Sequence, residues 1–357
     1  MNIFEMIKNI FKKQKTLQLP EGSQHLNNDR IAFKKSIINY KSNSSPLEAD
    51  ISAYLDSYYS LLSNYTQFNI YPSSYSALTR INSQYGYTSD KNYYNEYNLL
   101  RNLQETNSYT IQTQSSKGKT CFYHIRSNGY RLPNDDKMIR LYLNCKNDNV
   151  AELANSILKY NDVPNFYLKF SSSNVTATNP RSEKIVIYTD ENSCEHIISN
   201  LNNLRKWNPE LFQGSESTCA FLPKINNFIT YAREPVSTTY YDLYNNPRQI
   251  PKSANSFLAN ALEESFISTV NEITCSYEPE LYKYLNEFSK NPNDSDFKLR
   301  YVEQIPYIKE NYNNYLISSM TSKLQILAGK NSMQLRDLQP IYPQYRQTQN
   351  LEQKIYN

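Results

Sequence analysis

The sequence contains few of the residues on which common cofactor and metal sites are built. Only 6 of its 357 residues are glycine. Neither a Gly-x-Gly-x-x-Gly motif nor a P-loop can be written, which argues against the usual phosphate loops of dinucleotide and nucleotide sites. The three histidines, His25, His124 and His196, do not have the spacing of metal ligands. We therefore expect no metal site and no cofactor.

Other absences concern the compartment and the class of partner. The five cysteines include no C-x-x-C pair and no secretory pattern, which favours reduced thiols in a cytosol-like compartment. No run of 18 apolar residues is present, so we expect no transmembrane segment. The net charge of +4 is small for a dedicated nucleic-acid-binding protein, and we expect no nucleic-acid partner.

The first 45 residues predict an amphipathic helix followed by a linker. Residues 2–15 place apolar side chains on one helical face and lysines around it. They do not resemble a secretory signal, because their apolar residues are periodic rather than contiguous. The segment is interpreted as a terminal helix packed on the domain, or as a helix that contacts a membrane surface or a partner. Residues 16–46 are polar, with one short helical stretch expected at 29–40.

Hydrophobic periodicity predicts alternating helices and strands in the remainder of the chain. Helices are expected at 46–71, 90–106, 147–159 (capped by Asn147 or Asp148), 192–206 and 253–273 (capped by Ser253). Strands are expected at 110–113, 120–126, 138–145, 165–171, 184–189 and 227–233. Residues 72–90, 172–181 and 236–251 are expected to be loops, and 278–329 to alternate helical pieces with breaks.

These elements predict an α+β fold with a central, mostly antiparallel or mixed sheet flanked by helices. A helical N-terminal cap and a helical C-terminal region are expected on either side of the sheet in sequence. The expected domains are an N-terminal helix and linker (1–45), an α+β domain (46–277), a helical extension (278–333) and an extended tail (334–357). Within the α+β domain, 46–110 is the helical cap and 110–277 the sheet core.

The stretch from Met138 to Tyr188 carries most of the side chains that could bind a ligand or take part in catalysis. Its three expected strands alternate between apolar and polar residues, so one face is a core face and the other is polar. The polar face is rich in cations and tyrosines and has almost no carboxylates. This set includes Arg140, Tyr142, Lys169, Arg181 and Tyr188.

Such a face can bind an anion through arginines and use a lysine as a base. A lysine surrounded by other cations has a lowered pKa, which lets it accept a proton. This chemistry fits β-elimination of phosphate from a phosphorylated side chain. From spacing alone, however, exposed cations on one sheet face are more often solvated side chains.

Several segments resemble successive signatures of the HopA-type effector family. They are Arg140 to Asn144 (RLYLN), Tyr167 to Ser171 (YLKFS), Arg181 to Tyr188 (RSEKIVIY), Phe228 to Pro235 (FITYAREP) and Ser253 to Leu262 (SANSFLANAL). The resemblance spans roughly residues 50–275. This family also supplies the lyase component of some lanthipeptide and thioamitide biosynthetic systems, and its lyases are similar to phosphothreonine lyase effectors.

The resemblance implies a role for each matching residue. Lys169 would be the base and Arg181 a phosphate ligand. Arg140 and Tyr142 would stand where phosphothreonine lyases carry a lysine and an acid histidine, and Tyr188 would lie beside the site. Arg233 is a further candidate phosphate ligand. The sequence departs from the family pattern at Tyr142, which replaces histidine, and at Leu258, which replaces glycine near the start of the helix.

Two hypotheses follow from the sequence. In the first, the protein is a cofactor-independent carbon–oxygen lyase that removes phosphate from phosphothreonine or phosphoserine in a peptide or protein, which implies a partner kinase. In the second, it is an inactive HopA-like effector or a peptide- or protein-binding module. The first places it in a bacterial cytoplasm if it is biosynthetic, and both allow a host cell if it is secreted.

Overall fold

The computed structural model describes residues 45–68, 73–81, 83, 88–116, 118–133, 138–178, 181–216, 219–283 and 295–336. The helix expected at 2–15, the linker with its helical stretch at 29–40, and the tail beyond 336 lie outside these residues. The contacts divide the chain into two compact units. One contains the described residues up to Ala77 with Tyr241–Arg248 and Leu258–Lys330, and the other contains Leu78–Tyr240 with Gln249–Phe257. The domain boundaries expected from the sequence stay a prediction.

The second unit is built on a six-stranded sheet in which every neighbouring pair is antiparallel. Its strands are β1 (Tyr109–Ser116), β2 (Lys119–Ser127), β3 (Ile139–Leu143), β4 (Tyr167–Ser171), β5 (Ile185–Thr189) and β6 (Ile229–Arg233). They lie in the order β1-β2-β4-β5-β3-β6. This arrangement confirms the predicted α+β class and its antiparallel sheet.

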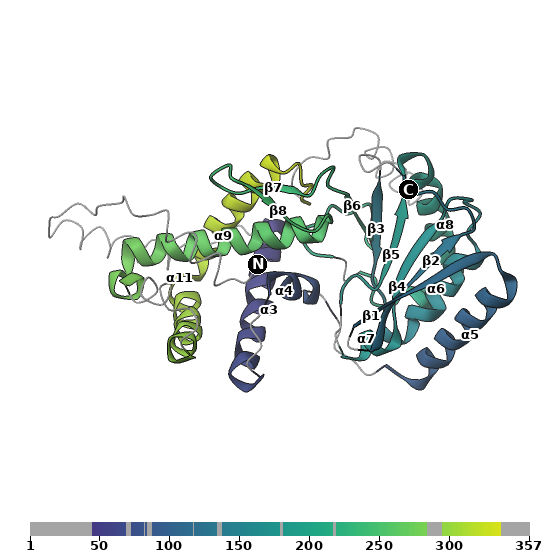
Figure 1. Ribbon diagram of the computed structural model, residues 1–357, viewed down its shortest axis with the longest axis horizontal. Helices are drawn as coiled ribbons and strands as arrows, with labels where there is room; N and C mark the ends of the chain where they lie inside the picture. The colour runs from purple at the N-terminus through teal and green to yellow at the C-terminus, as the bar shows by residue number, and fades with distance from the viewer. Residues whose placement is uncertain are drawn as a thin grey trace. The chain divides into compact units, whose positions relative to one another are not determined.

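One face of the sheet carries the hydrophobic core. Alternate strand residues on this face pack against α6 (Val150–Lys159) and α8 (Glu191–Trp207), which lie along the same side of the sheet (Figure 1). The buried strand residues include Ile125, Leu141, Leu168, Phe170, Ile185, Ile187 and Ile229. Because side chains alternate along a strand, the neighbouring positions form the opposite face, where the candidate site lies.

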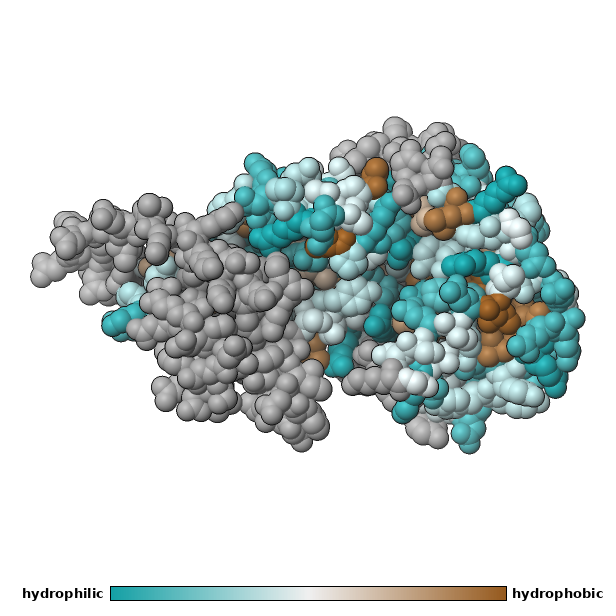
Figure 2. All heavy atoms as spheres, in the orientation of Figure 1, coloured by the Kyte–Doolittle hydropathy of each residue, from teal (hydrophilic) through white to brown (hydrophobic). Residues whose placement is uncertain are grey.

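The surface of the described residues is mainly polar on the side shown in Figure 2. Hydrophobic residues appear there as small, separate patches among hydrophilic ones. Scattered apolar residues of this kind are normal on the surface of a folded protein. Most large apolar side chains of the described residues are buried.

The helices expected in this unit are present, with differences at their starts. α5 (Asp90–Thr106) has the predicted bounds, and α8 begins after Asp190, whose carboxylate accepts the Ser193 N–H at 2.9 Å. The prediction of a cap at Asn147 or Asp148 was wrong. Residues Asn147–Asn149 form a 3-10 turn, and Asn149 precedes α6 without a side-chain cap.

Three segments predicted as loops contain regular structure. α4 (Ser74–Arg80) lies within 72–90, and Ser73 Oγ accepts the N–H of Ser76 at its start. α7 (Ser173–Thr178) follows β4, and the Ser173 N–H donates to the distant Glu96 carboxylate at 2.6 Å. The segment 236–251 forms a two-stranded sheet of β7 (Thr239–Tyr241) and β8 (Pro247–Gln249).

The first unit is helical. α3 (Pro46–Phe68) confirms the first predicted helix, and α9 (Ala254–Tyr277) begins after Ser253, whose Oγ accepts the Ser256 N–H at 3.0 Å. α11 (Ser295–Lys330) is one helical run with a kink at Tyr312, where the sequence predicted separate pieces. Its buried stripe of Ile308, Leu316, Met320, Leu324 and Leu327 continues across that kink. Within the described part of the chain, every helix is too short or too polar to span a bilayer.

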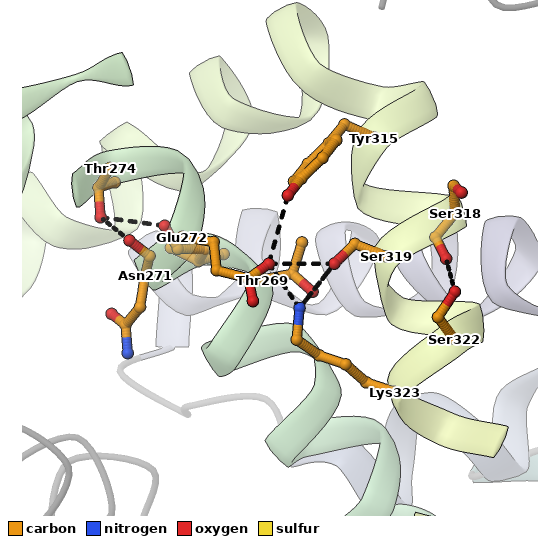
Figure 3. A network of polar contacts seen from close by, with 10 residues as sticks. Thr269, Asn271, Glu272, Thr274, Tyr315, Ser318, Ser319, Ser322 and Lys323 are labelled. Atoms are coloured by element: carbon orange, nitrogen blue, oxygen red, sulfur yellow. Dashed lines mark hydrogen bonds and ion pairs between the residues drawn. The ribbon is translucent and has the colours of Figure 1, made fainter. Parts of the chain in front are cut away.

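A polar network joins α9 to α11 within the first unit (Figure 3). Lys323 Nζ donates to Glu272 Oε2 and Ser319 Oγ, both at 2.6 Å, and to Thr269 Oγ1 at 3.1 Å. The lysine side chain is 12% exposed, and burial lowers its pKa. The network therefore stabilises a partly buried cation between two helices.

Replacing Glu272 by alanine is expected to destabilise the first unit by about 1–3 kcal/mol, because Lys323 then loses its charged partner. Urea unfolding followed by circular dichroism measures this change. Glu280→Ala removes an exposed glutamate from the same unit, and we expect it to shift stability by less than about 0.5 kcal/mol. Equal effects of the two substitutions would show that the network contributes nothing.

Candidate functional site

The second face of the sheet gathers polar side chains into two rows that cross β2, β4, β5 and β3. In the first row, Arg126 lies opposite Tyr167, Tyr167 opposite Tyr188, and Tyr188 opposite Arg140. The rings of Tyr167 and Tyr188 lie 4.1 Å apart and nearly parallel. The Arg126 guanidinium lies 4.7 Å from the centre of the Tyr167 ring, and that of Arg140 lies 4.8 Å from the Tyr188 ring. Cation–π contacts of this kind are worth about 0.5–2 kcal/mol each, so the row holds Tyr188 and Arg140 in place.

The second row runs beside the first. His124 lies opposite Lys169, Lys169 opposite Val186, and Val186 opposite Tyr142. The strand order β2-β4-β5-β3 therefore brings residues that are distant in the sequence onto one face of the sheet. Both Lys169 and Tyr142 lie on this face, as the sequence predicted.

Lys169 lies beside an aromatic ring and a second cation on this face. Its ammonium lies 4.0 Å from the centre of the Phe122 ring, and the Arg181 guanidinium lies 5.3 Å from the same ring. Burial lowers the pKa of Lys169, and Arg181 and Arg140 lower it further, whereas Glu183 raises it. Within the described residues, the Lys169 ammonium makes no side-chain hydrogen bond or ion pair, and the Phe122 ring is its neighbour.

His124 lies directly across the strand pair from Lys169. Its Nδ1 is 2.5 Å from the Tyr167 hydroxyl, and its Nε2 is 3.3 Å from Gln114 Oε1. Burial and the neighbouring cations Lys169 and Arg126 lower its pKa to about 4. At neutral pH the ring is therefore uncharged, accepting from Tyr167 at Nδ1 and donating to Gln114 from Nε2.

Two glutamates pair with the arginines of the site, contrary to the prediction that carboxylates are almost absent from this face. Arg140 Nη2 contacts Glu234 Oε2 at 2.6 Å, and Arg181 Nη1 contacts Glu183 Oε1 at 3.3 Å. Both carboxylates are buried. The prediction was wrong because Glu183 precedes β5 and Glu234 follows β6, so neither belongs to the alternating strand positions on which it was based.

The same glutamates hold the start of α9. The Ala254 N–H donates to the Glu234 carboxylate, and Asn255 Nδ2 donates to Glu183 Oε2 at 2.5 Å. The helix start therefore lies beside the site, and protein carboxylates occupy the position where an anion would be stabilised. Leu258, the departure from the family pattern, is buried.

Tyr142 is less suited to acid catalysis than its sequence position indicated. It is 1% exposed, and its hydroxyl has no hydrogen-bond partner among the described residues. Burial raises its pKa well above the usual range, so the phenol holds its proton strongly. The structure places Tyr142 on the expected face but encloses it in protein.

Arg233 is not brought to the cluster. It is in register with Ile139, so its side chain belongs to the face opposite Arg140, and it pairs with Glu191. Within the described residues, no group of three His, Cys, Asp or Glu side chains is placed to hold a metal ion. All five cysteines are free thiols.

Sequence reasoning missed several residues of the site. His124 and Arg126 are in phase with Phe122 on β2, and that alternation was the signal that could have placed them on the polar face. Tyr167 is in phase with Lys169 on β4, and it received no role. Glu183 and Glu234 left no periodic signal, because they lie just outside the strands.

Comparison with known proteins finds distant structural neighbours. No family model and no curated protein matches the chain. The effector protein from Pseudomonas syringae pv. syringae strain 61 is 12% identical, with a TM-score of 0.34 over 50% of this chain and 78% of that one. The effector protein from Pseudomonas syringae pv. tomato strain DC3000 is 14% identical, with a TM-score of 0.35 over 51% of this chain and 79% of that one. Likeness at this level does not indicate an activity.

The lowered pKa of His124 predicts a pH dependence of stability. A histidine in the unfolded chain has a pKa of about 6.5. The contribution of His124 to the free energy of unfolding is therefore fully present above that pH and is lost as pH falls toward 4. Proton NMR of the three histidines measures the pKa, and His124→Gln identifies the resonance. A pKa of 6.5 or higher for this ring would contradict the buried, cation-flanked environment.

Proposed function

We propose that the protein is a cofactor-independent carbon–oxygen lyase that eliminates phosphate from phosphothreonine or phosphoserine in a peptide or protein. The observation that carries the proposal is the position of Lys169. Its amine has a lowered pKa, lies beside Arg181 and faces His124 across the strand pair. The ordered motif resemblance described above supports the same chemistry.

Each step of the proposed elimination has a candidate residue in the site. The neutral Lys169 amine takes the proton from Cα, and the electrons of that C–H bond form the Cα–Cβ double bond. The Cβ–O bond then breaks, and phosphate leaves with the bonding pair. Arg181 and Arg140 would neutralise the charge of the leaving phosphate. The products are a dehydroamino acid and inorganic phosphate.

His124 is a better candidate than Tyr142 for protonating the leaving oxygen. It lies opposite Lys169, whereas the Tyr142 hydroxyl is enclosed and its pKa is raised. In the protein without substrate, burial and the cations Lys169 and Arg126 lower the pKa of His124. A bound phosphate dianion would offset these cations and raise that pKa, so substrate binding would favour the protonated ring.

The second candidate function is a non-catalytic module that binds a phosphorylated or acidic partner. The ion pairs Arg140–Glu234 and Arg181–Glu183 favour it, because each carboxylate already neutralises an arginine that would otherwise stabilise the leaving phosphate. A binding module would retain a phosphopeptide unchanged, whereas a lyase would convert it.

Incubation with phosphothreonine and phosphoserine peptides, read by mass spectrometry, separates the two functions. Elimination removes about 98 Da, whereas hydrolysis of the phosphate ester would remove about 80 Da. We expect the larger loss, and we expect it to weaken in His124→Gln but not in Tyr142→Phe. Binding without any mass change would support the second function and overturn the first.

A further inference from the structure

A small pocket lies on the helix-covered side of the sheet, away from the face that carries Lys169. It is lined by α6, the loop before β4 and α8, and its empty volume is about 270 Å³, part of it open to solvent. The lining residues are Ile157, Tyr160, Asn161, Phe166, Ile197, Asn200, Leu201 and Leu204. Its floor is therefore the hydrophobic core, and the pocket is smaller than the sites that enclose drug-sized ligands.

Two exposed aromatic residues stand at one end of the pocket. Tyr160 is 45% exposed and Trp207 is 62% exposed, and their rings lie 5.7 Å apart. Trp207 follows Leu204 by one helical turn on α8, so the pair extends the apolar lining outward. Exposed tryptophan and tyrosine beside an apolar pocket are typical of the residues that dominate binding energy at protein interfaces.

The pocket is acidic at the end where Asn200 lines it. Asp162 Oδ1 accepts from His196 Nε2 at 2.7 Å and from Asn200 Nδ2 at 2.8 Å. These hydrogen bonds lower the pKa of Asp162, so its carboxylate is charged at neutral pH. The carboxylate is 61% exposed, and the exposed Glu195 neighbours His196 on α8. A positively charged group is the complement of this end.

We propose that the groove between α6 and α8 docks a peptide segment of a partner protein. The segment would insert one apolar side chain into the pocket, contact Tyr160 and Trp207, and pair a lysine or arginine with Asp162. This site shares no residue with the candidate elimination site, so the two can be tested separately.

Trp207 reports directly on the groove, because it is the chain's single tryptophan. The probes are short peptides in which a leucine and an arginine are separated by zero to two glycines. We expect a saturable change in tryptophan fluorescence for at least one spacing, with a Kd of about 0.1–1 mM. Matched peptides with alanine for leucine, or glutamate for arginine, should bind at least about fivefold more weakly.

Two variants locate the binding. Asn200→Phe fills the mouth of the pocket from the helix surface and should abolish the response, while Asp162→Asn should remove the preference for arginine over glutamate. Circular dichroism confirms that each variant is folded. The proposal is overturned if no peptide gives a saturable response, or if both variants respond like the wild type. A fluorescence change that depends on protein concentration without peptide would instead assign the groove to a second copy of this chain.

Discussion

Replacing Lys169 by alanine is expected to abolish the elimination of phosphate from a phosphothreonine peptide. Removing a general base costs about 10²–10⁴-fold in rate, and among the described residues no second lysine on this face has a comparable position. Lys184 is buried with its amine held by the Cys145 carbonyl. Mass spectrometry of the peptide after timed incubation measures the rate.

Two controls separate the loss of the base from a loss of structure. Lys169→Arg keeps the positive charge but cannot supply a neutral amine at ordinary pH, so it should be as inactive as the alanine variant. Lys159→Ala removes an exposed lysine of the same unit and should leave the rate unchanged. Burial disfavours the charged Lys169 amine and the Phe122 ring favours it, so replacing Lys169 should change the melting temperature little. Elimination that persists in Lys169→Ala would show that another group takes the proton.

Replacing Arg140 by methionine is expected to destabilise the protein by about 3–5 kcal/mol, because it leaves the Glu234 carboxylate buried without its partner. Urea unfolding measures the change. The double variant Arg140→Met with Glu234→Gln removes the buried charge as well, and it should recover much of the lost stability.

The pH dependence of the Arg140→Met variant provides a further check. Burial already raises the pKa of Glu234, and Arg140 opposes that rise. Without the arginine, the Glu234 carboxyl keeps its proton up to a higher pH in the folded state than in the unfolded state. The destabilisation should therefore be smaller at acidic pH and grow as pH rises through the raised pKa. A loss of stability that is the same at every pH would show that packing, rather than the unpaired carboxylate, is responsible.

Local periodicity was sufficient to predict the polar face of the sheet. Arg140 and Tyr142 alternate with the core residues of β3, as Lys169 does on β4 and Tyr188 on β5. Their common face follows from a period of two within each strand. The rows across the sheet could not be predicted this way, because they depend on the order β2-β4-β5-β3, which local sequence does not encode.

Long-range contacts explain the elements that the sequence did not reveal. The short helix α7 is stabilised by Glu96, 77 positions away, which accepts from both the N–H and the hydroxyl of Ser173. Glu183 and Glu234 enter the site for a related reason, because each is positioned by an arginine or by the start of α9 rather than by a strand pattern. Polar residues outside regular elements carry no periodic signal.

The proposed elimination is tested most directly with a phosphothreonine peptide that carries deuterium at Cα. Because Lys169 is proposed to remove that atom, the product peptide should lack the deuterium and the phosphate together, and the rate should be lower than with the unlabelled peptide. Loss of phosphate with the deuterium retained would contradict elimination, as would a complete absence of reaction.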